Sequence, residues 1–198
     1  MAEPDSFPRL DRNAFSVRGL HEENDEKQYW AQKTPQERLE ALELMRQILY
    51  GYDPATTRLQ ELLQLLNAHQ VEYLLIGGYA VGYHGYPRAT VDMDIWIGRG
   101  PSTAAKMVEV LQEFGFDVPN LSAELFLKED QIVRMGVPPV RLEIFTSIPG
   151  VEFGHCYSAR VEGVMDGVKI SLINLQDLKV NKKATGRHQD LDDLENLP

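Results

Sequence analysis

The chain has 198 residues, a formal net charge of −10 at pH 7 and a sequence pI of about 5.0. Hydrophobic residues make up 43% of it and charged residues 25%, which is typical of a globular protein built as one domain, or as one domain with an appendage. The acidic charge argues against extended DNA binding, because contacts to many phosphates need a surface rich in lysine and arginine.

The sequence also bears on the cellular compartment and on disulfide formation. No apolar run approaches the roughly 20 residues that a membrane helix needs, and the first residues lack the basic and apolar regions of a signal peptide. The single cysteine, Cys156, excludes an internal disulfide and a multi-cysteine zinc site. We therefore expect a cytoplasmic location and no membrane partner.

The amino-terminal third is predicted to hold a flexible arm and a pair of helices. Residues 1–25 are polar, contain prolines and show no periodicity. Thr34, Pro35 and Glu37 then predict a helix start, because they supply an N-cap, a proline at the first helical position and a capping box. Apolar residues recur at helical spacing in two runs: Leu39, Leu42, Met45, Ile48 and Leu49, then Leu59, Leu62, Leu63 and Leu66. We expect this pair, residues 26–69, to pack on the core; the alternative is a partner-binding face.

The next segment combines a glycine turn with two acidic residues. The apolar run Val71–Ile76 predicts a strand that ends in Gly77-Gly78, with a short helix to about His84. A second strand, from Thr90 to Gly98, carries Asp92 and Asp94. Side chains two positions apart on a strand share a face, and their Cα atoms lie roughly 6.6 Å apart. These carboxylates can therefore converge on a hard cation such as Mg²⁺, or alternatively Mn²⁺, beside backbone N–H groups that bind phosphate.

The remaining elements complete an α+β, or α/β, pattern with a mixed sheet. A helix is predicted from Ser102, as its cap, to Phe114, with Ala105, Val108 and Leu111 facing inward. Short strands are predicted at 125–127 and 132–135, and a longer strand at 140–145. A hairpin of 159–165 and 168–172 around Asp166-Gly167 follows, with helical structure from Asn174 onward. The order of these elements predicts a sandwich of a mixed sheet and flanking helices.

Residues 76–95 resemble the signature of the DNA polymerase β nucleotidyltransferase superfamily. The match consists of Gly77-Gly78, a spacer of thirteen residues, and the run Asp92-Met93-Asp94-Ile95. The stretch from His84 to Thr90 is similar to small bacterial members, which include the AbiEii-like toxins of abortive-infection systems and related uncharacterised nucleotidyltransferases. The resemblance covers residues 71 to about 195. It implies a nucleotidyltransferase fold over residues 70–198.

The resemblance also implies roles for the acidic and glycine residues. Asp92 and Asp94 would be catalytic metal ligands, and Glu143, on a neighbouring strand, would be the third carboxylate, at a position where aspartate is commoner. Gly77 and Gly78 would form the phosphate turn, although many active members carry serine in the second position.

Basic residues would contact the nucleotide. In the pattern Asp177-Leu178, Lys182, Gly186-Arg187, Asp190, the resemblance implies that Lys182 reaches the triphosphate, whereas Arg187 and Asp190 are expected to pair with each other. Arg88 and Thr90 precede the acids as nucleotide-binding candidates. Arg88 has two open interpretations: it touches the triphosphate or orients the acids, or it only offsets local negative charge.

The leading functional hypothesis is a Mg²⁺-dependent nucleotidyltransferase. Such an enzyme moves a nucleoside monophosphate from a nucleoside triphosphate to a hydroxyl and releases pyrophosphate. The acceptor stays open among a small molecule, an RNA end and a protein. The alternative is a catalytically silent nucleotide-binding module of regulatory or toxin–antitoxin type, which the glycine at 78 and the glutamate at 143 keep open. A third option is an interaction protein that acts through its amino-terminal helices.

Overall fold

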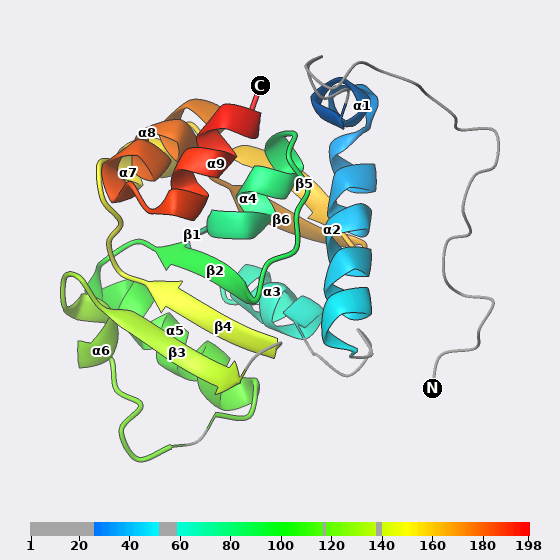
Figure 1. Cartoon of the computed structure of the whole chain (residues 1–198). Coiled ribbons are helices and arrows are strands. Elements are labelled where there is room, and N and C mark those ends of the chain that lie inside the picture. The colour runs from blue at the N-terminus through cyan, green and yellow to red at the C-terminus, as the bar shows by residue number, and fades with distance from the viewer. Residues whose placement is uncertain (1–25, 52–58, 117, 138–139) are drawn as a thin grey trace.

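A mixed six-stranded sheet forms the centre of the computed structural model, which describes residues 26–51, 59–116, 118–137 and 140–198 (Figure 1). The expected flexible arm, residues 1–25, lies outside the described residues. The strands are β1 (Tyr73–Leu75), β2 (Asp92–Ile97), β3 (Ile132–Val137), β4 (Val140–Phe145), β5 (Val161–Met165) and β6 (Val168–Leu172), in the spatial order β3-β4-β2-β1-β6-β5. β2 pairs with β4 and β1 with β6 in parallel, and the other neighbours are antiparallel. The predicted mixed sheet is confirmed.

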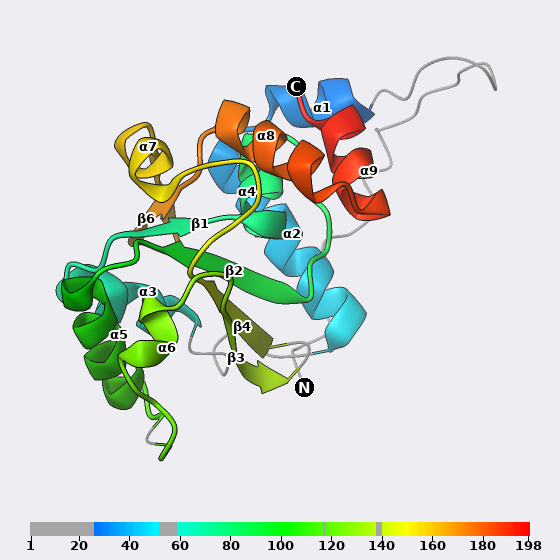
Figure 2. The same ribbon diagram turned by 90° about the vertical axis from the view of Figure 1, so that its left-hand side faces the viewer.

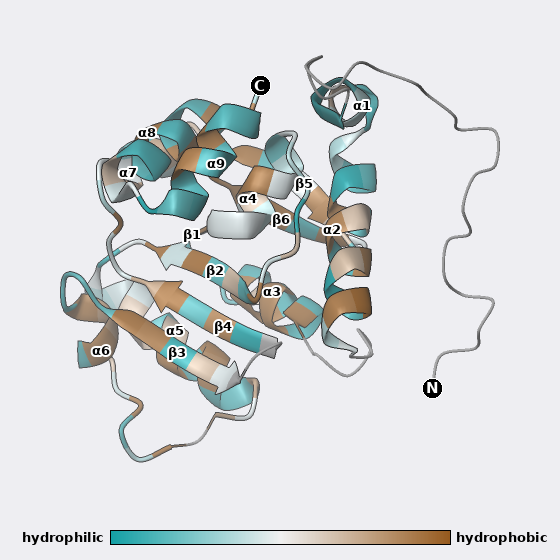
Figure 3. Cartoon of the chain, viewed as in Figure 1, coloured by the Kyte–Doolittle hydropathy of each residue, from teal (hydrophilic) through white to brown (hydrophobic). Residues whose placement is uncertain are grey.

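Helices cover both faces of this sheet. They are α1 (Glu26–Gln32), α2 (Pro35–Tyr50), α3 (Leu59–Ala68), α4 (Gly77–His84), α5 (Pro101–Glu113), α6 (Glu124–Leu127), α7 (Phe153–Ser158), α8 (Leu175–Thr185) and α9 (His188–Asn196). Figures 1 and 2 show α4, α7, α8 and α9 on one face and α3, α5 and α6 on the other. In Figure 3 the hydrophobic residues concentrate on the strands and on the helix sides turned toward them. Within the described ranges, no helix combines the length and apolar character needed to cross a bilayer.

Alternation along β2 separates the core from the cleft. Met93, Ile95 and Ile97 are fully buried in the larger of two hydrophobic clusters, together with leucines of α2 and α3 and apolar residues of α5. Asp92 and Asp94 occupy the alternate positions and therefore face the opposite side. This alternation is the pattern that the sequence predicts for the second strand.

The long helix α2 begins as its sequence predicts. The Thr34 hydroxyl accepts a hydrogen bond from the Glu37 N–H (3.2 Å), and the Glu37 carboxylate accepts one from the Thr34 N–H (2.7 Å). Leu42 is fully buried, and its Cδ1 packs so tightly on Gly82 of α4 that a Cβ there would lie 2.7 Å away. The apolar stripe of α2 is not buried over its whole length, since Ile48 near the end of the helix is 57% exposed.

Two local predictions farther along the chain are wrong. α5 begins at Pro101 with Gly100 as N-cap, so Ser102 is inside the helix and does not cap it. Proline suits the first helical position because its φ is already helical and its missing N–H would have no helical partner there. Of the three residues expected to face inward, Leu111 is buried and Val108 packs against the core, whereas Ala105 is exposed and its neighbour Ala104 is buried. The segment expected as a strand at 125–127 is the short helix α6, a length at which helical and strand periodicity are not distinguishable.

Leu42→Ala tests whether α2 is integral to the fold. The substitution leaves a cavity against α4, and we expect it to lower the free energy of unfolding by about 2–5 kcal/mol. Ile48→Ala, in the same helix but exposed, should change it by less than about 0.5 kcal/mol. Urea unfolding monitored by circular dichroism measures both values. Equal small effects would mean that α2 does not contribute to the core.

Candidate functional site

A cleft of about 460 Å³ opens over the face of β2 and β4 that carries the acidic residues, beside α4 and α8. Its lining brings together every nucleotide-binding and metal-binding candidate of the sequence: Gly77, Gly78, Arg88, Thr90, Asp92, Asp94, Glu143 and Lys182. These residues come from two strands, two helices and the loop before β2. Their convergence makes this cleft the candidate site.

The parallel pairing of β2 with β4 places three carboxylates side by side. Asp94 lies directly opposite Glu143, and Asp92 lies opposite Arg141. Because neighbouring strands are about 4.8 Å apart, the side chains of these four residues share one small area of the sheet. A hard divalent cation prefers carboxylate oxygens, so the donor atoms are of the right kind.

Two arginines that the sequence reading missed neutralise part of this acidic group. The Asp92 carboxylate accepts two hydrogen bonds from Arg141, from Nε at 2.7 Å and from Nη2 at 2.5 Å. The Glu143 carboxylate accepts one from Arg134 Nε at 2.8 Å and lies 3.3 Å from Arg141 Nε. The alternation of side chains along β4 could have indicated Arg141, because it places Arg141 on the same face as Glu143.

Asp94 differs from the other two carboxylates. Among the described residues it has neither an ion-pair partner nor a hydrogen-bond donor, and burial, followed by the charges of Glu143 and Asp92, raises its pKa to about 7. Its Oδ2 lies directly over Gly77, where a Cβ would come within 1.9 Å of it. Within the described ranges, no three acidic, histidine or cysteine side chains form a ready-made metal site. In this structure Asp92 is engaged by Arg141 and Glu143 by Arg134.

The glycine pair shapes the floor of the cleft. Gly77 has a φ of +57°, and Gly78 packs under Thr90 so closely that a Cβ there would lie 2.6 Å from the threonine side chain. No side chain caps α4 at Ile76, so the first N–H groups of this helix keep their capacity to bind an anion. The Thr90 carbonyl in turn accepts a hydrogen bond from Arg46 of α2 (2.9 Å).

Lys182 is in the cleft lining but is already paired. It is 4% exposed, and its Nζ lies 2.7 Å from both Asp190 Oδ1 and Asp193 Oδ2. The predicted pair of Arg187 and Asp190 is confirmed, with Nε donating to Oδ2 at 2.8 Å. The predicted triphosphate lysine is therefore held by two carboxylates of α9.

Arg88 contacts neither Asp92 nor Asp94. Its Nε and Nη2 donate to the two oxygens of Asp193 at 2.5 and 2.8 Å. This pairing, working against burial, raises the pKa of Arg88. The interpretation in which Arg88 orients the acids directly is therefore wrong, because its guanidinium points to α9. The sequence reading missed Asp193, although its spacing from Asp190 places both on one side of a helix.

His84 and Tyr79, two ring side chains of α4 that each have a polar partner, serve the packing. His84 Nε2 lies 2.7 Å from the Ile173 carbonyl, and burial lowers its pKa. Tyr79 is buried, and its hydroxyl contacts Arg46 and donates to Glu43. These contacts explain the side chains without a bound base.

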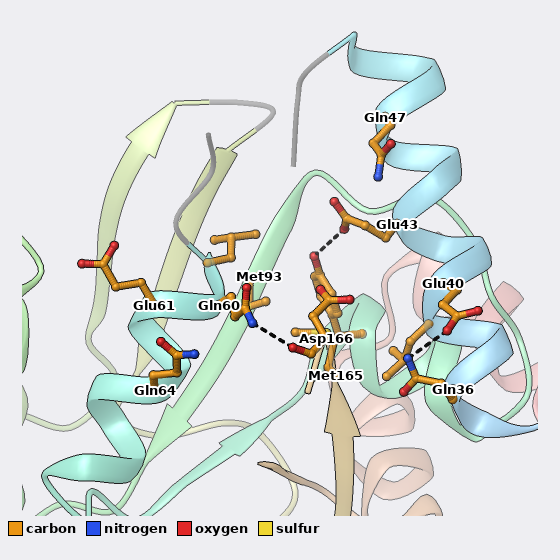
Figure 4. Close-up of a pocket in the computed structure, with 13 residues that line it drawn as sticks. Gln36, Glu40, Glu43, Gln47, Gln60, Glu61, Gln64, Met93, Met165 and Asp166 are labelled. Atoms are coloured by element: carbon orange, nitrogen blue, oxygen red, sulfur yellow. Dashed lines mark hydrogen bonds between the residues drawn. The ribbon is translucent and has the colours of Figure 1, made fainter. Parts of the chain in front are cut away.

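A second cleft, of about 430 Å³, lies between α2 and α3 (Figure 4). Its described polar lining consists of glutamines and of Glu40, Glu43, Glu61 and Asp166, with no lysine or arginine among them. Burial, followed by the charges of Glu43 and Glu40, raises the pKa of Asp166. This acidic lining would repel a triphosphate, so the cleft at β2 and β4 is the better candidate for an anionic substrate.

Comparison with known proteins leaves the family open. No family model matches the chain, and no curated protein sequence matches it. One structural match is a protein of Thermotoga maritima described as a "putative nucleotidyltransferase". The two chains are 18% identical, and the match covers 69% of this chain and 88% of the other with a TM-score of 0.48.

The raised pKa of Asp94 predicts a pH-dependent stability in metal-free protein. In the unfolded chain this carboxyl has its ordinary pKa, near 3.8, whereas in the folded chain the value is about 7. Between these values the folded state binds more protons, so this group's contribution makes the free energy of unfolding fall as the pH rises. Asp94→Asn removes the contribution. The variant should exceed the wild type in stability at pH 8, and the difference should shrink toward pH 4.

Chemical unfolding in EDTA at several pH values measures this difference. Glu162→Gln, an exposed carboxylate of β5, serves as the control and should follow the wild type at every pH. A difference between Asp94→Asn and the wild type that does not change with pH would contradict the assigned environment.

Proposed function

We propose that the protein is a divalent-metal-dependent nucleotidyltransferase, which transfers a nucleoside monophosphate from a nucleoside triphosphate to a hydroxyl and releases pyrophosphate. The observation that carries this proposal is the alignment of Asp92, Asp94 and Glu143 on one face of two parallel strands, next to the start of α4. Carboxylates for a cation and backbone N–H groups for phosphates are the two parts that such chemistry requires.

Each part of the cleft has a role in this proposal. The N–H groups at the start of α4 and the cations Lys182 and Arg187 would bind the triphosphate. Asp92, Asp94 and Glu143 would hold Mg²⁺ or Mn²⁺. When bound, the metal would supply charge neutralisation of the leaving pyrophosphate and activation of the acceptor hydroxyl. A serine at position 78 would not fit beside Thr90, because a Cβ there would lie 2.6 Å from the threonine side chain.

A second candidate function has its own support. Arg141 and Arg134 already neutralise Asp92 and Glu143, which is the arrangement expected if the acids serve only to hold the fold. The protein would then be a catalytically silent nucleotide-binding module of regulatory or toxin–antitoxin type. It would bind a triphosphate through α4 and Lys182, and release no pyrophosphate.

Metal-dependent binding of a nucleoside triphosphate tests the proposal first. Measured by calorimetry, the affinity of the wild type for at least one nucleoside triphosphate should be at least about tenfold higher in Mg²⁺ than in EDTA. A tenfold ratio corresponds to about 1.4 kcal/mol of binding free energy. Asp94→Asn should lose this gain because one of the three proposed metal ligands loses its charge, whereas Glu162→Gln should keep it. The same weak binding in Mg²⁺ and EDTA for wild type would count against a metal site.

Transfer is tested separately, with triphosphates labelled at the α-phosphate and fractionated cell extract as the source of acceptor. Label that moves to a small molecule, to an RNA end or to a protein identifies the acceptor class, and pyrophosphate should appear in equal amount. Metal-dependent binding without transfer or pyrophosphate would favour the silent module.

Competition between Arg141 and the metal gives a further prediction. Arg141→Gln releases Asp92 from its two hydrogen bonds, so the affinity for Mn²⁺ should rise by about tenfold, which corresponds to about 1.4 kcal/mol. Arg134→Gln is the matched control, since Arg134 is 60% exposed and contacts only Glu143 of the three acids; its effect should be clearly smaller. Electron paramagnetic resonance of free Mn²⁺ measures both affinities. Weaker Mn²⁺ binding in Arg141→Gln would show that this arginine supports the metal site.

A further inference from the structure

A buried ionic network joins α9 to the loop before β2 and to α8, which both line the candidate site. Asp193 is fully buried and receives the Arg88 fork on both carboxylate oxygens, while Lys182 Nζ lies 2.7 Å from its Oδ2. Asp190, 1% exposed, completes the network by pairing with Lys182 and Arg187. Figures 1 and 2 both show α9 lying against α8, the helix that carries Lys182.

The geometry of Asp193 fixes two cations at once. A bidentate arginine–carboxylate pair sets the plane of both groups, which a point contact does not. With the Asp193 carboxylate held in this plane, the position from which Lys182 Nζ can contact its Oδ2 is also fixed. Because an unpaired charge is costly in a buried position, neither Arg88 nor Lys182 can leave this arrangement without replacing its partner.

These two cations come from different elements that line the cleft. Arg88 lies on the loop that leads through Thr90 to Asp92, and Thr90 packs on Gly78 at the start of α4. Lys182 comes from α8. Asp193 therefore connects the loop before β2 to α8 through a single side chain.

We infer that Asp193 is a positioning residue, which holds Lys182 and Arg88 in place for the β- and γ-phosphates of a triphosphate. The inference rests on the proposed function, because it takes the cleft as a triphosphate site. The acidic group on β2 and β4 has one formal negative charge in excess, three carboxylates against Arg141 and Arg134, which a bound cation would neutralise. In the network, by contrast, Lys182, Arg88 and Arg187 face two carboxylates, Asp190 and Asp193, so the network itself has one excess positive charge. That excess favours a polyphosphate over a monophosphate.

Asp193→Asn separates positioning from simple charge compensation, because the two roles predict opposite signs. If Asp193 only weakened the positive field, its neutralisation would make polyphosphate bind more tightly. If it positions the cations, the asparagine amide cannot accept the arginine fork on both sides and polyphosphate binding falls. We expect the affinity for inorganic tripolyphosphate and for nucleoside triphosphates to fall at least about tenfold, the ratio that a difference of about 1.4 kcal/mol produces.

Nucleoside monophosphate binding is the internal reference, and its affinity should fall much less. The matched control is Asp192→Asn: Asp192 neighbours Asp193 but is exposed and accepts a hydrogen bond from the Tyr86 hydroxyl. It removes the same charge from the same helix and should leave all affinities unchanged. Calorimetry on the full chain, well below the unfolding midpoint of each variant, measures the three ligands.

A second variant guards against misfolding of Asp193→Asn. Arg88→Lys keeps the charge but loses the bidentate geometry, so it should also weaken tripolyphosphate binding more than monophosphate binding. Unchanged or tighter polyphosphate binding in a folded Asp193→Asn, or in Arg88→Lys if only that variant folds, overturns the inference. Equal losses for polyphosphate and monophosphate also overturn it. Failure of the wild type to bind any polyphosphate would instead contradict the proposed function.

Discussion

The parallel pairing of β2 with β4 is the constraint on which the rest of the site depends. Its register sets Asp94 opposite Glu143 and Asp92 opposite Arg141, so side chains from distant parts of the chain meet on one face of the sheet. Three carboxylates this close together repel one another. The structure offsets that repulsion in two ways: Arg141 and Arg134 pair with the outer two acids, and Asp94 has a raised pKa. A shift of β4 by one residue in this register would turn Arg141 and Glu143 to the other face and away from Asp92 and Asp94.

The same crowding explains why glycines stand at the start of α4. Gly77 leaves room for the Asp94 carboxylate, and Gly78 leaves room for the Thr90 side chain. The helix therefore begins as close to the acidic face as its backbone allows. Behind it, α2 packs on α4 through Leu42, and Arg46 of the same helix holds the Thr90 carbonyl. Helix α2 thus helps to position the loop that carries Arg88 and Thr90, in addition to covering apolar surface.

The sequence predicted the features that depend on neighbouring residues. The capping box at Thr34, the alternation of β2 and the hairpin around Asp166-Gly167 all have local causes, and the structure contains each of them. The glycine and acid pattern also identified residues that share one cleft. The ion pairs were not predictable in this way. Arg141 and Asp92 meet because of strand order, and Arg88, Lys182 and Asp193 meet because α9 folds back onto α8; neither arrangement follows from spacing along the chain. For α5, the start was assigned to Ser102 and not to Pro101, and Ala105 is exposed, whereas Val108 and Leu111 face the core as predicted.

The central claim is that one cleft binds a divalent cation and a triphosphate together at the face of β2 and β4. The most direct measurement is an anomalous difference map from crystals grown with Mn²⁺ and a non-hydrolysable nucleoside triphosphate analogue. We expect a manganese peak beside the carboxylates of Asp94 and Asp92, with Arg141 turned away from Asp92 and the phosphates at the start of α4. A manganese peak only in the acidic cleft between α2 and α3, or an analogue bound away from Gly77 and Gly78, would contradict it.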